Sequence, residues 1–194
     1  VNANIAVTPT ITVNTVTCPG PIQNFVITVN PTPTVNSVAN QTICNNTSTN
    51  LVTLGGAVAG TVYNWSNSNP SIGLTNNGTG NIPAFIGQNA TFNPVQGTVS
   101  VTPTFTNNGI SCTGLPISTL FTINPSPDVI PVANQILCDN SNSSAVNFTS
   151  NVANAQFTWT NSNNTIGLAS SGIGNIPIFN AQNNGNLPLT ATIS

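Results

Sequence analysis

The cysteines and aspartates are the side chains whose types could support covalent, acid–base or metal chemistry in this sequence. There are four cysteines and two acidic residues, Asp128 and Asp139, and there is no Lys, Arg, His or Glu. Enzymes draw their general bases, general acids and anion clamps largely from these missing types. We therefore predict that the chain is not an enzyme and holds no cofactor.

The surroundings of the two aspartates do not predict a metal site. Tight calcium sites gather several carboxylates in one loop, whereas Asp139 is followed only by the amides of Asn140 and Asn142. This trio could make a weak calcium site, but a turn or a cap explains it better. The cysteines show no CxxC spacing and have no histidine to join them, so we expect no zinc site.

Composition also excludes two classes of partner. A surface without a single cation cannot displace the counterions of phosphates, so we expect no nucleic-acid partner. No apolar run approaches the roughly 20 residues that cross a bilayer, so we expect no membrane insertion. Gly78-x-Gly80 and its counterpart Gly172-x-Gly174 have no lysine after them, and tight turns explain them better than a phosphate-binding loop.

The sequence repeats itself without insertions. Cys44 returns as Cys138 and Trp65 as Trp159, which fixes the step at 94 residues. Such self-similarity indicates an array of structural units, and we expect further copies on both sides. The phase of the repeat predicts three parts: the C-terminal strands of one unit in 1–30, a complete unit in 31–124, and the first three quarters of another in 125–194.

Hydrophobic alternation predicts an all-β fold. Apolar residues such as Val99 and Val101 alternate with hydroxyl side chains, and Asn-Gly pairs separate such runs. Seven short strands in about 94 residues is the size of an immunoglobulin-like β-sandwich. For the complete unit, strands are expected near 35–43, 50–55, 61–66, 71–75, 82–86, 97–106 and 117–124.

Aromatic residues on these strands are candidates for the core between the sheets. Trp65 and Trp159 lie on alternating strands, where a large apolar side chain is usually packed inward. A sugar-stacking platform is the alternative role for the two tryptophans. The other predicted core residues are Tyr63, Phe157, Phe105 and Phe121.

Proline pairs are expected to join consecutive units. Pro31 and Pro33 precede the complete unit, and Pro125 and Pro127 precede the next one. Alternating prolines favour an extended geometry, so a short, semi-rigid linker and an end-to-end rod are predicted.

The motifs of one unit resemble a known family when they are taken together. They are Asn-Pro-x-Pro-x-Val, Asn-Gln-x-Ile/Leu-Cys, Phe/Tyr-x-Trp and Ser-Cys-Thr-Gly. This order resembles the PKD-like, immunoglobulin-like tandem repeats of giant surface adhesins that Bacteroidota export by type IX secretion, including gliding and biofilm-forming species. The resemblance implies an extracellular β-sandwich stalk at the bacterial cell surface, although related repeats usually carry more charge.

The cysteines permit several pairings. Cys44 with Cys112 would close one unit and leave Cys18 and Cys138 with partners in units beyond this sequence. Pairing Cys18 with Cys44 and Cys112 with Cys138 would instead link neighbouring units, and free buried thiols are a third possibility. The resemblance favours the bond within the unit, as does the expectation that each unit folds on its own.

An uncharged repeat of this kind predicts a mechanical role. We expect a structural stalk of a long adhesin or filament, with reach and protease resistance, whose partners are neighbouring repeats and, by lateral association, other copies. One alternative is a binding module that holds glycans or surfaces through loops 66–81 and 160–175, although a surface or glycan ligand could also sit at a distant tip. The other is a self-assembling extracellular fibre subunit completed by strand exchange.

Overall fold

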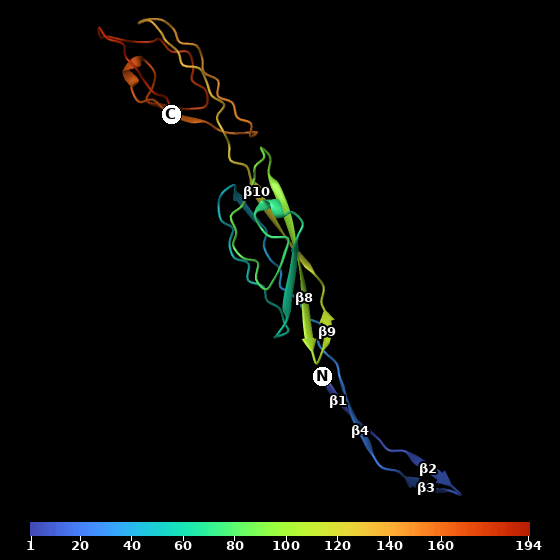
Figure 1. The fold of residues 1–194 in the computed structure, drawn as a ribbon. Helices are drawn as coiled ribbons and strands as arrows, with labels where there is room; N and C mark the ends of the chain where they lie inside the picture. The colour runs from blue at the N-terminus through green and yellow to red at the C-terminus, as the bar shows by residue number, and fades with distance from the viewer. The chain divides into compact units, whose positions relative to one another are not determined.

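The computed structural model describes all residues from 1 to 194, and its regular secondary structure is almost entirely β (Figure 1). It contains no α-helix, and its two helical elements are single 3-10 turns. The all-β prediction is confirmed, and the sheets are compatible with a β-sandwich. The strands are β1 (Asn2–Val7), β2 (Thr10–Val13), β3 (Val16–Pro19), β4 (Gln23–Thr28), β5 (Gln41–Cys44), β6 (Val62–Asn67), β7 (Asn77–Thr79), β8 (Val95–Asn107), β9 (Ile110–Thr113), β10 (Ile117–Asn124), β11 (Thr158–Thr160) and β12 (Ser171–Ile173).

The chain folds into two compact units, each assembled from more than one segment. The first unit consists of Val1–Ile43, Thr47–Gly87 and Gln96–Thr122, and the second of Cys44–Asn46, Gln88–Val95 and Ile123–Ser194. No helix in either unit has the length and hydropathy that a membrane crossing requires.

One sheet organises the first unit. Its strand order is β5-β10-β8-β6-β7, and β9 pairs with β8 beyond that path. The central strand β8 is 13 residues long, and its partners include β6, where Trp65 faces Val101, and β9, where Phe105 faces Cys112. The length of β8 follows from its sequence, because Thr or Ser alternates with an apolar residue from Thr98 to Thr106.

The core of the first unit lies against the inner face of this sheet. Val99, Val101 and Phe121 have no exposed surface, because their strands place them on the same side. Phe85 contacts Phe121 edge-on, with ring centroids 5.3 Å apart. A second layer, formed by the segments around Val52 and Ile82, covers them with no regular strand of its own.

The strands predicted at 50–55 and 82–86 do not form as regular strands in that second layer. Side chains there take the place of some of the backbone partners that a strand would have. The two segments meet at a bridge between Val52 and Ile82. Next to it, the Leu54 amide donates to Asn81 Oδ1 at 2.9 Å and the Phe85 amide donates to Thr49 Oγ1 at 3.0 Å. Short polar side chains compete in this way with a backbone ladder, so the ladder stops.

The predicted strand at 71–75 is wrong. The chain forms the 3-10 turn η1 (Pro70–Ile72), which begins when the Asn69 side chain accepts a hydrogen bond from the Ser71 amide. Gly73 ends the turn in the left-handed region, at a φ of 100°. An Asn-Pro start followed by a glycine stop outweighs the hydrophobic alternation here.

The second unit repeats these contacts 94 residues later. Val146 and Ile176 exchange backbone hydrogen bonds as Val52 and Ile82 do. Trp159, Leu168 and Ile176 form its buried core, packed against partly buried hydrophobic residues. Its 3-10 turn η2 (Asn164–Ile166) is capped by Asn163 and ends at Gly167, in the same manner as η1.

Residues 1–30 form two hairpin-like pairs, β1 with β4 and β2 with β3. Their side chains are almost all exposed, although they match a buried part of the chain. Ile27 is 49% exposed, whereas its counterpart Phe121 is fully buried. In the repeat, β1 and β4 correspond to parts of β8 and β10. The face that is buried against the core in β8 and β10 is therefore exposed in the β1–β4 pair.

Candidate functional site

The two tryptophans are buried at equivalent positions. Trp65 is 5% exposed and Trp159 is 6% exposed. Each indole packs on a glycine of the adjacent strand, since a Cβ on Gly78 would lie 2.2 Å from Trp65 Cζ2 and one on Gly172 would lie 2.3 Å from Trp159 Cζ2. Both indole Nε1 groups are buried without a hydrogen-bond partner. The indoles offer too little open surface for a sugar ring to stack.

The other aromatic residues predicted for the core differ in depth. Phe121 is fully buried in the sheet, while Tyr63, Phe105 and Phe157 are half-buried. Phe157 lies against Phe148, with ring centroids 5.6 Å apart. Phe121 and Phe157 thus pack against other aromatic rings, as core residues do.

Asp128 holds a loop of the second unit. Its Oδ1 accepts hydrogen bonds from Ser150 Oγ at 2.7 Å and from the Asn151 amide at 2.8 Å. The bond from Ser150, followed by those from Asn151, lowers the pKa of Asp128 below its ordinary value. At the equivalent place in the first unit, Thr34 Oγ1 accepts from the Ala57 amide at 3.0 Å. A neutral hydroxyl thus accepts the equivalent hydrogen bond in the first unit.

Asp139 has a similar structural role. Its Oδ1 accepts a hydrogen bond from the Asn183 amide at 2.8 Å, and its other oxygen accepts from Asn140 Nδ2. The counterpart Asn45 Oδ1 accepts from the Asn89 amide, also at 2.8 Å. The structure contains no cluster of three His, Cys, Asp or Glu residues. Both carboxylates therefore accept hydrogen bonds from loops that are distant in sequence.

The prolines predicted as linkers are not equally free. Pro33 is fully buried, and its carbonyl oxygen lies 1.9 Å from the place that a Cβ on Gly114 would take. Pro31 and Pro127 are exposed, and Pro125 is half-buried. The segment that follows Asn30 is therefore packed onto the first unit, with Gly114 required for the close approach.

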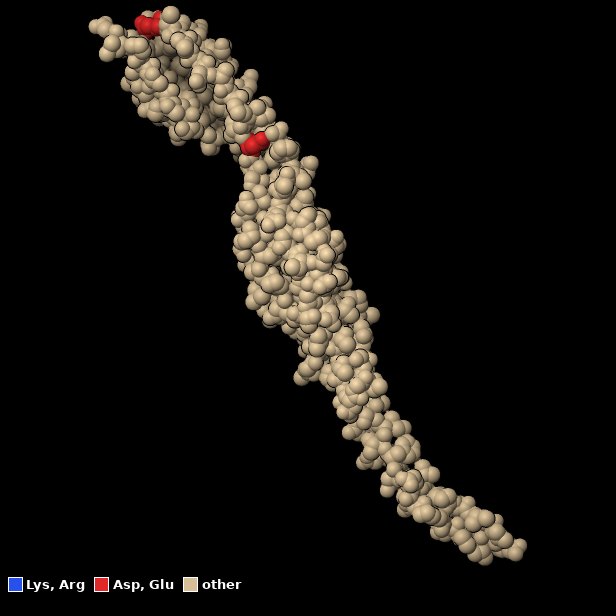
Figure 2. Space-filling model, in the orientation of Figure 1, with Lys and Arg blue, Asp and Glu red and all other residues tan.

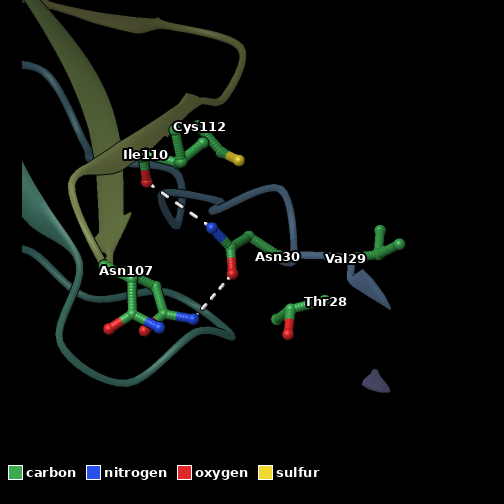
Figure 3. Close-up of a pocket in the computed structure, with 7 residues that line it drawn as sticks. Thr28, Val29, Asn30, Asn107, Ile110 and Cys112 are labelled. Carbon is green, nitrogen blue, oxygen red and sulfur yellow. Dashed lines mark hydrogen bonds between the residues drawn. The ribbon is translucent and has the colours of Figure 1, made fainter. Parts of the chain in front are cut away.

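A contact inside the first unit joins Asn30 to the turn between β8 and β9 (Figure 3). Asn107 Nδ2 donates to Asn30 Oδ1 at 2.8 Å, and Asn30 Nδ2 donates to the Ile110 carbonyl at 3.5 Å. Asn108 and Gly109 make the turn with φ values of 48° and 79°, as a two-residue hairpin requires. A pocket of about 330 Å³ lies here, lined by Thr28, Val29, Asn30, Asn107, Asn108, Ile110 and Cys112.

The four cysteines lie in different surroundings. Cys18 faces Ile11 across the β2–β3 pair and is exposed. Cys44 ends β5 and is exposed, Cys112 on β9 is half-buried, and Cys138 is exposed. Cys112 lines the pocket next to Asn30.

The structure does not bring Cys44 and Cys112 together. At the start of β8, the Gln96 side chain donates to Thr122 near the end of β10. The amide of Asn45, the residue after Cys44, donates to the Asn124 carbonyl. Cys112 faces Phe105, nine residues further along β8, which corresponds to about 30 Å of strand. A disulfide requires Cα atoms within about 7 Å.

Comparison of the sequence with models of known protein families gives no match, and comparison with curated proteins gives none either.

Proposed function

We propose that this chain is a structural stalk segment of a long extracellular cell-surface adhesin or filament, made of tandem immunoglobulin-like repeats of about 94 residues. The observation that carries this proposal is the recurrence of the same framework in two separate compact units. The buried tryptophan on its glycine, the bridge between the two layers and the asparagine-capped 3-10 turn all return 94 residues later. Units that close their own cores can be added in series without new chemistry.

The use of polar groups supports a mechanical role. Asparagine, threonine and serine side chains hold the loops by bonding the backbone, as Asn67 does at the Leu74 carbonyl and Asn161 at the Leu168 carbonyl. Figure 2 shows the two aspartates as the only charged side chains on the visible face. Since both also accept hydrogen bonds from loops, the only two charged side chains serve to maintain the fold.

A self-assembling fibre subunit is a second candidate, favoured by one observation. The β1–β4 pair exposes Phe25 and Ile27, whose counterparts Thr119 and Phe121 are buried in the first unit. This face matches the part of a unit that β8 and β10 supply. A second copy could use it to complete residues 125–194, and sedimentation velocity over a range of concentrations would then show polymers in place of monomers.

Deletion of residues 31–124 in frame, within the protein on its producing cells, tests the stalk against a binding module. A deletion of this length removes one step of the repeat and preserves its phase. The stalk proposal expects shorter surface filaments, unchanged display on intact cells and unchanged adhesion per filament at close range. Adhesion that falls in proportion to the number of copies would instead identify the repeats as binding modules.

A further inference from the structure

We propose that the cysteines form disulfides between consecutive 94-residue repeats of the sequence, of which residues 31–124 are one: Cys44 of one repeat bonds to the cysteine that corresponds to Cys112 in the repeat that follows. The inference rests on the tandem arrangement proposed above. It differs from a bond between Cys44 and Cys112 of the same unit, and it also runs opposite to a bond from Cys112 to Cys138.

The first observation places Cys44 beside the end of β10. Asn40 Oδ1 accepts from the Leu120 amide at 2.8 Å, and the Asn45 amide donates to the Asn124 carbonyl at 2.8 Å. The two strands therefore run side by side in the same direction. Cys44, one residue before Asn45, lies next to Asn124 and the residue before it, and it is exposed.

The second observation places Cys112 beside the residues that correspond to this strand end. Val29 and Asn30 are the counterparts of Ile123 and Asn124, because 94 residues separate each pair. Cys112 lines the same pocket as Val29 and Asn30. Figure 3 shows the Asn30 side chain between Asn107 and the Ile110 carbonyl, with Cys112 next to Ile110.

The two observations concern equivalent positions of consecutive repeats, so they can be combined. In a longer chain, the counterpart of Cys44 in the preceding unit lies beside Val29 and Asn30, where Cys112 already lies. A disulfide joins Cα atoms that are about 4.4 to 6.8 Å apart, which is close to the spacing of about 4.8 Å between neighbouring strands. The bond therefore requires both cysteines to lie on the same side of the chain segment that ends at Asn30. The pocket of about 330 Å³ next to Asn30 leaves room for the second side chain.

The same rule assigns a partner to each cysteine of this chain. Cys18 and Cys112 bond backward, to the unit before their own, and Cys44 and Cys138 bond forward. No two of the four cysteines then bond to each other. Every joint between units carries one covalent bond besides the polypeptide, so pulling on a filament loads the disulfide and the proline segment together.

Formation of each bond is a two-electron oxidation. One thiolate attacks an external disulfide, of a thiol oxidoreductase or of an oxidised small thiol, and releases one of its sulfurs as a thiolate. The second cysteine thiolate then attacks the resulting mixed disulfide and displaces the other sulfur. The two cysteines lose two protons and two electrons, and the external disulfide becomes two thiols.

The test compares this chain with an extended chain that carries a second copy of residues 101–124 after Ser194. The extension supplies the counterpart of Cys112 in the following unit. After folding with oxidised glutathione, free thiols are alkylated and a non-reducing digest is analysed by mass spectrometry. We expect all four thiols of the original chain to be alkylated, and the extended chain to link the Cys44 peptide to the added cysteine.

Two matched variants of the extended chain separate the possible pairings. C44S is expected to abolish the cross-linked peptide, whereas C112S is expected to leave it intact. A peptide that links Cys44 to Cys112, or full alkylation of the folded extended chain, would overturn the inference. Either result leaves the stalk proposal standing if the deletion of residues 31–124 still shortens the filaments without loss of adhesion.

Discussion

The side chain of Asn30 accepts a hydrogen bond from the side chain of Asn107, 77 residues later, at 2.8 Å. This bond attaches the strand end before the prolines to the turn that follows β8, the longest strand in the chain. Replacing Asn30 by Ala should therefore loosen that turn, at a cost of about 1 kcal/mol. Hydrogen exchange at the amides of 107–112 measures it, and N2A, which removes an exposed asparagine in β1, is the control. Equal exchange in the two variants would show that the contact does not hold the turn.

Gly78 leaves space for the Trp65 indole, so a methyl group there should force the ring out of place. The substitution G78A is expected to lower the free energy of unfolding by about 1 to 3 kcal/mol, because overpacking strains a close-packed core. Chemical denaturation monitored by tryptophan fluorescence measures the change. At Gly55 a Cβ would meet only the Asn36 side chain, at 3.8 Å, so G55A should change stability little. G78A as stable as G55A would contradict the packing argument.

Asp128 makes the stability of the second unit depend on pH in the acidic range. Its counterpart in the first unit, Thr34, does not titrate. Hydrogen bonds from Ser150 and Asn151 lower its pKa in the folded state below the ordinary 3.8. The stabilisation is therefore complete above that ordinary value and is lost as the pH falls through the lower folded-state pKa. We expect D128T to unfold at a midpoint that changes less between pH 5 and pH 2 than that of the original chain. Parallel pH profiles would show that this carboxylate is not linked to folding.

Thermal unfolding should depend little on sodium chloride. The chain has a formal net charge of −2 and no cation, so there is no ion pair for salt to screen. Unfolding midpoints at low and at moderate sodium chloride should agree within a few degrees, and trypsin should leave the unfolded chain intact. A large shift in the midpoint would point to bound ions that the fold itself does not reveal.

Local sequence patterns predict those strands and turns whose conformation does not depend on contacts with residues distant in the sequence. The alternation around Val99 and Val101 predicts β8, because one face of the strand is buried throughout. The pattern at 71–75 misleads, because Asn69 and Gly73 start and stop a turn more strongly than the apolar residues favour a strand. The segments at 50–55 and 82–86 are extended, but their ladders are interrupted by side chains that lie far away in sequence.

The candidate site at Asn30 could not be predicted from local sequence. The Asn-Asn-Gly run at 107–109 predicts a turn, yet nothing near it names Asn30 as its partner. The position of Cys112 also depends on the length of β8. Cys112 lies on β9, which pairs with the end of β8 that is remote from Asn124, the last residue of β10. The repeat is the one sequence feature that indicates this site, because Asn30 and Asn124 occupy equivalent positions in consecutive 94-residue repeats.

Thr49 and Asn81 have a consequence for behaviour in concentrated solution. Exposed strand edges normally invite a foreign strand, and many proteins guard them with lysine, which this chain does not have. Here the amides of Phe85 and Leu54 are already occupied by a hydroxyl and a carboxamide. At these two positions an intruding strand finds no open backbone donor. In a nearly neutral chain, polar side chains thus take the place of lysine at these two positions.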